Sequence, residues 1–307
     1  MPHYSSLEEI SLKNSFLTVG VFDGVHRGHR EIIQKLVKDA HAKDSPAVVL
    51  TFEPHPATVL TGKQIRCLTT PQERVDLLSS LGVDDVITQR FTPDLAALSA
   101  HEYMSRLKTH LGLRHLLIGY DFALGKAREG NAPRLAEIGS ELGYTVEVVA
   151  ALGDESGVIS STEIRKLVST GNMGEAAKLL GYSYSLGGEV IHGEGRGKKI
   201  NFPTANIDYP KQKAIPPNGI YACWARLGND RFMAATNIGL NPTFTPERKI
   251  PSLEAYLMDF DRDIYGETLT LEFVKRLRDE IRYTTVEALI EQIHEDVTQT
   301  RAILNAV

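Results

Sequence analysis

Two histidines three residues apart lie in a glycine-containing run that could bind the phosphates of a nucleotide. The run reads Val19-Gly20-Val21-Phe22-Asp23-Gly24-Val25-His26-Arg27-Gly28-His29. Glycines at 24 and 28 let the backbone approach a phosphate, and a helix that begins here would offer unpaired N–H groups. Imidazole donors beside an α-phosphate would stabilise the negative charge that develops on its oxygens during nucleotidyl transfer. Histidines at a helix start can also be simple caps, so the surrounding elements matter.

A second glycine-containing run, in the C-terminal half, is basic. It extends from His192 to Lys199. It is not a Walker motif, because three residues rather than four separate its first and third glycines and no Ser or Thr follows Lys198. Such a turn between antiparallel strands can bind phosphate through backbone N–H groups, or it can be a solvated hairpin tip. The residues predicted to bind phosphate are Gly193, Gly195, Arg196, Gly197 and Lys198.

The elements of the N-terminal half place the first run at a strand end. Apolar segments at 16–22, 47–52, 83–87, 115–118 and 145–149 predict strands buried on both faces, with helical patterns between them. Thr70-Pro71-Gln72-Glu73 predicts a capping box that opens one of these helices. The alternation predicts an α/β domain with a doubly wound parallel sheet, whose ligands bind at the carboxyl ends of the strands.

The C-terminal half changes period. Residues 220–224 and 269–273 alternate with a period of two, and Gly and Pro turn signals separate these segments, which predicts a small antiparallel β-barrel. A final helix is predicted from a capping box at Thr284–Glu287. Its apolar stripe is interpreted as packing: Val286, Leu289, Ile290, Ile293, Val297 and Leu304. Two short helices precede the barrel, so the predicted domains are 1–180 and 181–307.

Bulk composition limits the class of protein. The 307 residues suit two domains, and a net charge of −5 disfavours a nucleic-acid groove. No apolar run is long enough to span a membrane, and no membrane partner is expected. Cys67 and Cys223 stand far apart and predict reduced core thiols. Since residues 1–14 lack the apolar region of a secretory signal, we expect a cytoplasmic protein; its oligomeric state is left open.

The first run resembles a known family. Its HxGH placement is similar to the nucleotidylyltransferase superfamily, with a Rossmann-like fold. The fuller string GVFDGVHRGH resembles the FMN adenylyltransferase module of bacterial riboflavin kinase/FAD synthetases. The resemblance implies catalytic roles for His26 and His29 on the ATP phosphates. It extends phosphate or ATP binding to Gly20, Phe22, Asp23, Gly24 and Gly28.

Three further N-terminal segments resemble motifs of that module. Residues 51–56 (TFEPHP) imply a loop bordering the cleft, and residues 119–125 resemble GxDFxFG, with Leu124 in place of the usual phenylalanine. The residues implied to bind flavin are Pro54, His55, Asp121 and Phe122. Residues 160–165 resemble SSTxIR, which would contact the triphosphate through Ser160, Ser161, Thr162 and Arg165. Taken alone, that segment is a helix cap.

The C-terminal half resembles the riboflavin kinase of the same family. Residues 201–206 resemble GFPTAN, with Asn201 replacing glycine. This implies that Thr204 and Asn206, two residues apart and bearing hard oxygen ligands, hold Mg²⁺. Residues 237–244 resemble NIGxRPTF, with Asn241 in place of arginine.

The strand at residues 252–260 resembles the one that carries the kinase's general base. This implies that Glu254 takes the proton of the attacking hydroxyl; on periodicity alone it is a polar strand residue. Tyr256 replaces a frequent histidine, and Arg278 is implied to lie near the flavin.

The resemblance therefore implies a bifunctional transferase. It would phosphorylate riboflavin to FMN in the C-terminal domain and adenylylate FMN to FAD in the N-terminal domain, with ATP and Mg²⁺. Alternatives remain: a riboflavin kinase alone, a non-catalytic flavin-binding regulator, or a nucleotidylyltransferase for another phosphorylated alcohol. The presence of both histidines, the SSTxIR segment and Glu254 favours the bifunctional enzyme.

Overall fold

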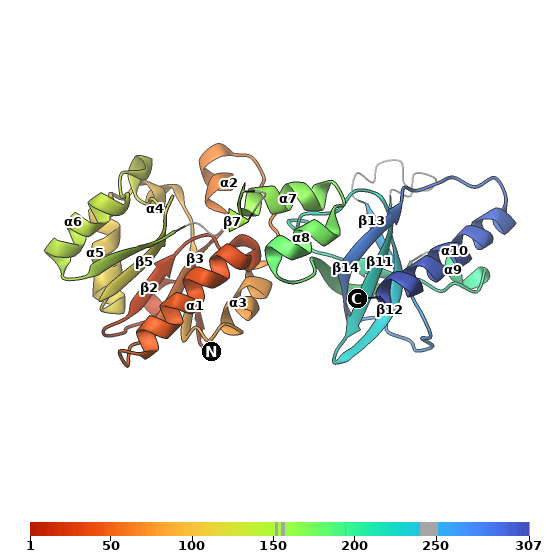
Figure 1. Cartoon of the computed structure of the whole chain (residues 1–307), viewed down its shortest axis with the longest axis horizontal. Helices are drawn as coiled ribbons and strands as arrows, with labels where there is room; N and C mark the ends of the chain where they lie inside the picture. The colour runs from red at the N-terminus through yellow and green to blue at the C-terminus, as the bar shows by residue number, and fades with distance from the viewer. Residues whose placement is uncertain (151–152, 155–156, 194, 240–250, 307) are drawn as a thin grey trace. The chain divides into compact units, whose positions relative to one another are not determined.

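The computed structural model describes residues 1–150, 153–154, 157–193, 195–239 and 251–306. The chain forms two compact units, Met1–Ser161 and Thr162–Val307 (Figure 1). The predicted boundary at 180/181 lies further along the chain, and two short helices fall between the two positions. Within the described part of the chain, no helix is both long and apolar enough to cross a bilayer.

The first unit is built on a six-stranded sheet in the order β1-β4-β3-β2-β5-β6, and every neighbouring pair is parallel. The strands are β1 (His3–Tyr4), β2 (Phe16–Val19), β3 (Ala47–Glu53), β4 (Asp85–Arg90), β5 (His115–Gly119) and β6 (Thr145–Val149). The order reverses at β2, with β3 on one side and β5 on the other. In open α/β sheets this reversal creates a crevice at the carboxyl ends of the strands.

Helices cover both faces of this sheet (Figure 1). The helices are α1 (Arg27–His41), α2 (Pro56–Thr61), α3 (Pro71–Ser79), α4 (Pro93–Ala97), α5 (Ala100–Leu111) and α6 (Ala132–Leu142). Short 3₁₀ turns are η1 (Leu7–Glu9), η2 (Asp23–Val25) and η3 (Lys126–Arg128), and β7 (Gly153–Asp154) pairs with β8 (Gly157–Val158).

Successive strand residues point to opposite faces, which separates two cores. Leu17 packs with residues of α5 and α6, whereas Phe16 packs with residues of α1 and α3. The predicted doubly wound fold is therefore confirmed.

Local signals account for several element boundaries. Thr70 accepts a hydrogen bond from the Glu73 N–H at 3.2 Å and Glu73 accepts one from the Thr70 N–H at 2.8 Å, so the predicted capping box is confirmed. The predicted strand at 16–22 is too long. It ends at Val19, because Phe22 has a φ of 49° and has left the extended region.

The second unit contains a closed antiparallel barrel, which confirms the predicted barrel, and its strand order is β10-β13-β12-β11-β14-β9. The strands are β9 (Ser185–Ile191), β10 (Ala205–Asp208), β11 (Gly219–Leu227), β12 (Asp230–Gly239), β13 (Ser252–Leu257) and β14 (Thr268–Arg278). Helices α7 (Ser161–Ser169) and α8 (Met173–Leu180) precede it, and α9 (Arg196–Lys199) connects β9 to β10. Cys223 is buried in β11 and Cys67 is buried in the first unit, as expected for core thiols.

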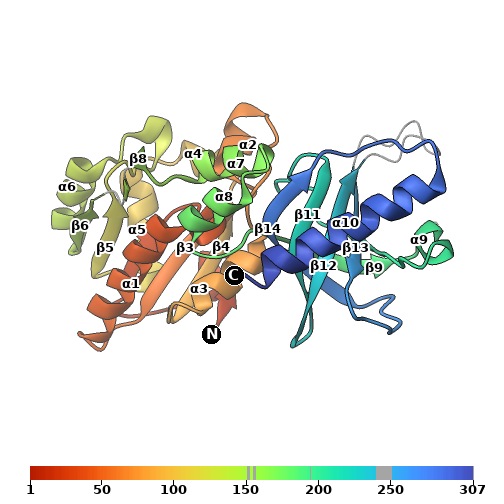
Figure 2. The ribbon, with the colours of Figure 1, turned by 45° about the vertical axis from the view of Figure 1, so that its right-hand side comes forward.

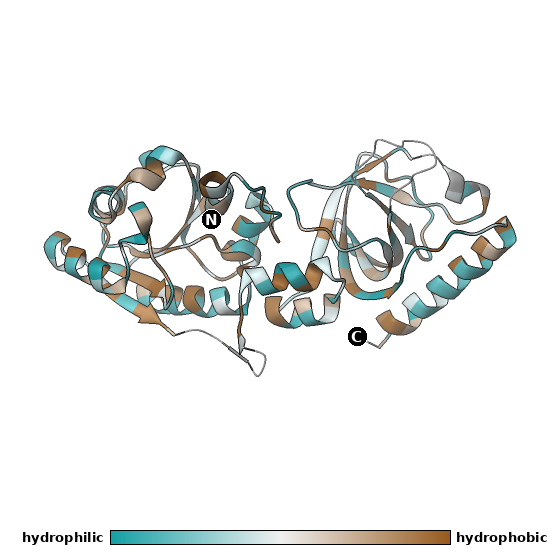
Figure 3. Cartoon of the chain, turned by 90° about the horizontal axis from the view of Figure 1, so that it is seen from above, coloured by the Kyte–Doolittle hydropathy of each residue, from teal (hydrophilic) through white to brown (hydrophobic). Residues whose placement is uncertain are grey.

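The final helix, α10 (Val286–Leu304), packs on β11, β12 and β14 (Figure 2). Its N-cap is Thr285, one residue later than predicted. Brown and teal segments alternate along it in Figure 3. The prediction that its whole apolar stripe is packing was wrong: Leu304 is buried, but Val286 is exposed, and Leu289 and Ile293 line a cavity.

Candidate active sites

The first run forms a tight loop between β2 and α1. Three of four successive residues have positive φ, namely Phe22 (49°), Gly24 (78°) and Val25 (35°), and the backbone turns sharply after the strand end. Only glycine adopts this region without steric cost, and such strain persists at functional sites where the surroundings hold it. The loop lies at the carboxyl end of the strand where the sheet order reverses.

The two motif histidines lie together at the start of α1. His26 caps the helix by accepting a hydrogen bond from the His29 N–H at 3.4 Å, and the two rings stack with centroids 3.6 Å apart. Burial lowers the pKa of His26 to about 4. Burial, then the charges of His26 and Arg74, hold the pKa of His29 well below its ordinary value. Both imidazoles are therefore neutral N–H donors at neutral pH, and a bound polyphosphate would raise both pKa values.

Asp23 has a buried carboxylate that fastens the loop. It accepts hydrogen bonds from the N–H groups of Leu68 (2.8 Å) and Thr69 (3.2 Å). The Asp23 carbonyl accepts a bond from the Ser161 hydroxyl at 2.9 Å. This contact joins two predicted motifs that are far apart in sequence. It places the N-terminus of α7 beside the loop at residues 20–29, which we call the phosphate loop after its predicted role. Further along α7, the Arg165 guanidinium donates to the Thr162 hydroxyl at 3.1 Å.

Arg74, on α3, is a charged residue near this loop that the sequence analysis missed. Its side chain is 1% exposed and donates to the Thr51 hydroxyl at 2.9 Å and to the Phe52 carbonyl at 3.1 Å. The Thr51 hydroxyl in turn donates to the Val21 carbonyl at 2.9 Å. Arg74 thus supports the strand end and the phosphate loop together. The only sequence signal that could have identified Arg74 is the position of an arginine beside the core residues of a predicted helix.

A cavity of about 460 Å³ opens next to the loop. Its walls are mostly apolar and aromatic: Val19, Gly20, Val21, Phe52, Pro56, Leu60, Phe91, Leu95, Ala96, Tyr103, Asp121, Phe122, Ala123, Leu124, Gly125, Ala127 and Arg128. Of the predicted flavin residues, Asp121 and Phe122 line it. Pro54 and His55 do not, since His55 instead caps α2 by accepting from the Ala57 N–H at 3.1 Å. Leu124, the departure from the family pattern, contributes an aliphatic wall.

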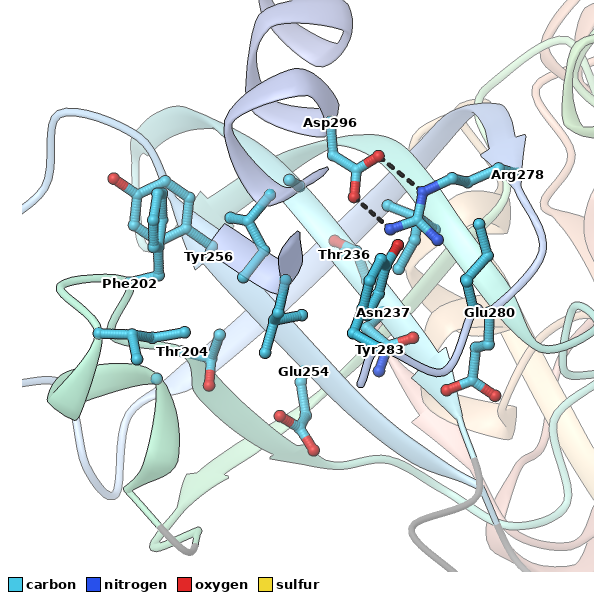
Figure 4. Close-up of a pocket in the computed structure, with 17 residues that line it drawn as sticks. Phe202, Thr204, Thr236, Asn237, Glu254, Tyr256, Arg278, Glu280, Tyr283 and Asp296 are labelled. Carbon is cyan, nitrogen blue, oxygen red and sulfur yellow. Dashed lines mark hydrogen bonds and ion pairs between the residues drawn. The ribbon is translucent and has the colours of Figure 1, made fainter. Parts of the chain in front are cut away.

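The barrel has its own cavity, of about 280 Å³ (Figure 4). Its lining combines aromatic, aliphatic and carboxylate side chains: Gly197, Ile200, Phe202, Thr204, Ile220, Ala235, Thr236, Asn237, Glu254, Tyr256, Arg278, Glu280, Ile281, Tyr283, Leu289, Ile293 and Asp296. The predicted residues Thr204, Glu254 and Arg278 are among them. Phe202 packs edge-on against Tyr256, with centroids 5.1 Å apart, so the tyrosine that replaces a histidine forms part of the wall.

Sheet register brings the predicted base and one predicted metal ligand together. Glu254 on β13 stands opposite Asn206 on β10 and opposite Asn237 on β12. The Ser252 hydroxyl donates to the Glu254 carboxylate at 3.2 Å. Asn237 has a buried Oδ1 with no hydrogen-bond partner among the described residues, and the sequence analysis assigned it no role. One carboxylate and two amides therefore converge at one side of the barrel.

The second glycine run packs closely against this group. A side chain at Gly193 would collide with the Asn206 amide, and one at Gly197 with the Phe202 carbonyl. Asn201 has a φ of 62°, a left-handed conformation that asparagine tolerates, so its replacement of glycine keeps the backbone turn. Thr204 lines a further cavity, of about 310 Å³, together with Lys198. The threonine therefore lies where two cavities meet.

Arg278 is held by a buried carboxylate on α10. Its Nε and Nη2 donate to the two oxygens of Asp296 at 2.8 and 2.6 Å, as the dashed lines in Figure 4 show. Paired in this way, the two side chains join the end of β14 to α10 at the cavity wall. Asn241 and its neighbours to Phe244, which carried part of the predicted resemblance, lie outside the described residues.

Fold and sites together define a transferase with two nucleotide-dependent centres, a parallel-sheet centre for nucleotidyl transfer and a barrel centre for phosphorylation. The FAD synthetase family profile matches residues 8–163 and the riboflavin kinase family profile matches residues 180–304. The chain belongs to the family of bifunctional riboflavin kinase/FMN adenylyltransferases, with the two domains in that order.

Named relatives agree along almost the whole chain. A bifunctional riboflavin kinase/FMN adenylyltransferase of Listeria monocytogenes is 36% identical over 302 residues, which cover 98% of this chain and 96% of the relative. The enzyme of the same name from Escherichia coli K12 is 34% identical over 299 residues, which cover 96% and 95%. A crystal structure of a protein named Macrolide-efflux Protein from Streptococcus pneumoniae has a TM-score of 0.88 at 30% identity and covers 97% of this chain and 98% of its own. The name of the Streptococcus pneumoniae protein applies to that protein alone, and the comparison shows that the two chains share a fold.

Proposed function

We propose that the barrel cavity carries out riboflavin phosphorylation with Glu254 as the general base. Glu254 would take the proton of the terminal ribityl hydroxyl as that oxygen attacks the γ-phosphorus of ATP, and ADP would leave. The observation that supports this assignment is the register of Glu254 opposite Asn206 and Asn237 on the two neighbouring strands. Apolar and aromatic walls suit the flavin ring.

The phosphate side of this centre is proposed to lie at the Gly193–Lys198 turn and the adjoining cavity. Thr204 lines both cavities, which suits a residue at the point where the hydroxyl meets the γ-phosphate. Mg²⁺, when bound to Thr204 and Asn206 together with phosphate oxygens, would neutralise the charge of the transferred group. No three His, Cys, Asp or Glu side chains gather as metal ligands within the described ranges, and magnesium held chiefly by substrate phosphates does not need them.

In the first unit, we propose that His26 and His29 donate hydrogen bonds to the α-phosphate of ATP. An FMN phosphate oxygen would attack the α-phosphorus, and the bond to the bridging oxygen would break to release pyrophosphate. The supporting observation is the Ser161 bond to the Asp23 carbonyl, which joins the helix-start motif to the phosphate loop. The 460 Å³ cavity would hold the flavin ring, with Asp121 and Phe122 in its wall.

The proposed catalytic domains are 1–180 and 181–307. Gly181 ends α8 in a left-handed conformation, and the riboflavin kinase match begins at residue 180. In the compact units, α8 groups with the barrel rather than with the parallel sheet.

The direct test is a time course with riboflavin, ATP and Mg²⁺, in which the flavins are separated by chromatography. FMN should appear first and FAD second. FMN without FAD would indicate that only the kinase reaction occurs, and unchanged riboflavin would favour a flavin-binding regulator.

Two variants test the assignment of residues. His29→Ala should reduce FAD formation from FMN by roughly a hundredfold or more, the effect of losing one transition-state donor, and leave FMN formation intact. Glu254→Ala should do the reverse, by roughly 10²- to 10⁴-fold. Equal loss of both activities in either variant would contradict the two-site assignment.

A further inference from the structure

The cavity of the first unit has few charged side chains in its walls. Among the described residues that line it, only Asp121 and Arg128 carry a charge, and the remaining walls are apolar or neutral. The same lining includes Gly20 and Val21, which begin the phosphate loop. Arg128 is therefore the one cationic side chain among these lining residues, in a cavity that extends from the phosphate loop along aromatic walls.

Arg128 lies on a short loop that is fastened at both ends. Leu124 and Gly130 form a two-hydrogen-bond bridge, with N···O distances of 3.2 and 2.9 Å. The Lys126 N–H donates to the Leu98 carbonyl at 2.8 Å, and the Glu129 carboxylate accepts from the Ala100 N–H at 2.8 Å. These contacts attach the loop to the start of α5 and hold the backbone on both sides of Arg128, whose side chain is exposed.

The backbone at this position is strained. Ala127 and Arg128 have φ values of 55° and 60°, and neither is glycine. Residues in this region cost free energy and persist where the surrounding structure holds them, often at ligand-binding sites. Among the residues that the structure describes, the Arg128 guanidinium donates one bond, from Nη2 to the Asp121 carbonyl at 2.9 Å, and most of its five N–H donors remain for a ligand.

We propose that Arg128 binds the phosphate of FMN and makes this site select FMN over flavins that lack a phosphate. The inference rests on the proposed placement of the flavin in this cavity. Selection matters because riboflavin, the substrate of the other domain, shares the flavin ring and differs by the phosphate. A guanidinium recognises phosphate through paired, charge-assisted hydrogen bonds and would also offset the repulsion between FMN and the ATP phosphates.

The test compares Arg128→Gln, Arg128→Lys and a matched control, Lys126→Gln. Lys126→Gln removes one positive charge from the same loop, but Lys126 does not line the cavity. FAD formation from FMN and ATP gives the KM for each substrate. Lumiflavin, which has the flavin ring but no chain to phosphorylate, serves as a competitor of FMN and gives an inhibition constant for ring binding alone.

Arg128→Gln should raise the KM for FMN roughly 10- to 100-fold, the effect expected for losing a charge-assisted contact. The lumiflavin inhibition constant and the KM for ATP should stay within about twofold, and Arg128→Lys should recover part of the loss. Lys126→Gln should behave like the parent protein.

A parallel weakening of FMN and lumiflavin would show that Arg128 only shapes the cavity, and a raised KM for ATP would assign it to the nucleotide. Either result, or an unchanged KM for FMN, overturns the proposal. A parent protein that makes no FAD from FMN would instead refute the proposed function of the whole unit.

Discussion

Replacing Asp296 with alanine should destabilise the barrel and weaken the binding of riboflavin. The Asp296 side chain is 5% exposed and that of Arg278 is 20% exposed, and two hydrogen bonds join them. Removing one partner of a fully buried pair costs about 3–5 kcal/mol, because the remaining charge is uncompensated. Arg278 still reaches some water and keeps a bond to the Asp279 carbonyl at 2.8 Å. We therefore expect a loss of about 2–3 kcal/mol.

The chain offers a specific probe for this measurement. Its single tryptophan, Trp224, lies in β11, so tryptophan fluorescence reports the barrel and not the parallel sheet. With a urea dependence of about 2 kcal/mol/M, the expected loss lowers the midpoint of unfolding by roughly 1 M. The KM for riboflavin should rise as well, since Arg278 lines the cavity.

Arg301→Ala is the matched control on the same helix. Arg301 pairs with Asp259, but the two side chains are 45% and 74% exposed, so the pair contributes less than about 1 kcal/mol. Asp296→Asn, which keeps the shape and removes the charge, should lie between the control and Asp296→Ala. If Asp296→Ala unfolds at the same urea concentration as Arg301→Ala, the reasoning from burial is wrong.

Two further predictions concern the first unit. Arg74→Met should reduce FAD formation from FMN at least tenfold, because the Phe52 carbonyl and the Thr51 hydroxyl lose a charged donor, while FMN formation continues. Arg74→Lys should restore part of the activity. A fully active Arg74→Met protein would contradict this role. Since burial holds the pKa of His26 at about 4, the unfolded state takes up a proton first as the pH falls below 6.5, and the unit should lose stability between pH 6.5 and 4. Thermal unfolding across that window should show a steeper fall for the wild-type protein than for His26→Asn, and parallel curves would count against the buried, neutral imidazole.

Much of the local structure could be predicted from residue patterns. The capping box at Thr70 is a contact between near neighbours, and the buried apolar strands and the switch to a period of two are visible in the order of apolar and polar residues along each segment. The error in a strand end arises where contacts with distant residues override the local pattern. The strand predicted to reach Phe22 ends at Val19, because the turn that follows is held by Asp23 and by residues more than forty positions away.

The sequence by itself determined the class of each domain, the two glycine-containing runs proposed to bind phosphate and the family, because these depend on local residue order. Only the tertiary structure decided which residues share a site. Glu254 stands opposite Asn206 through sheet register, and Arg74 lies beneath the phosphate loop through the packing of α3. Arg128 lines the cavity of the first unit because its loop is attached to the start of α5. Such contacts join segments far apart in sequence, and no local pattern of residues encodes them.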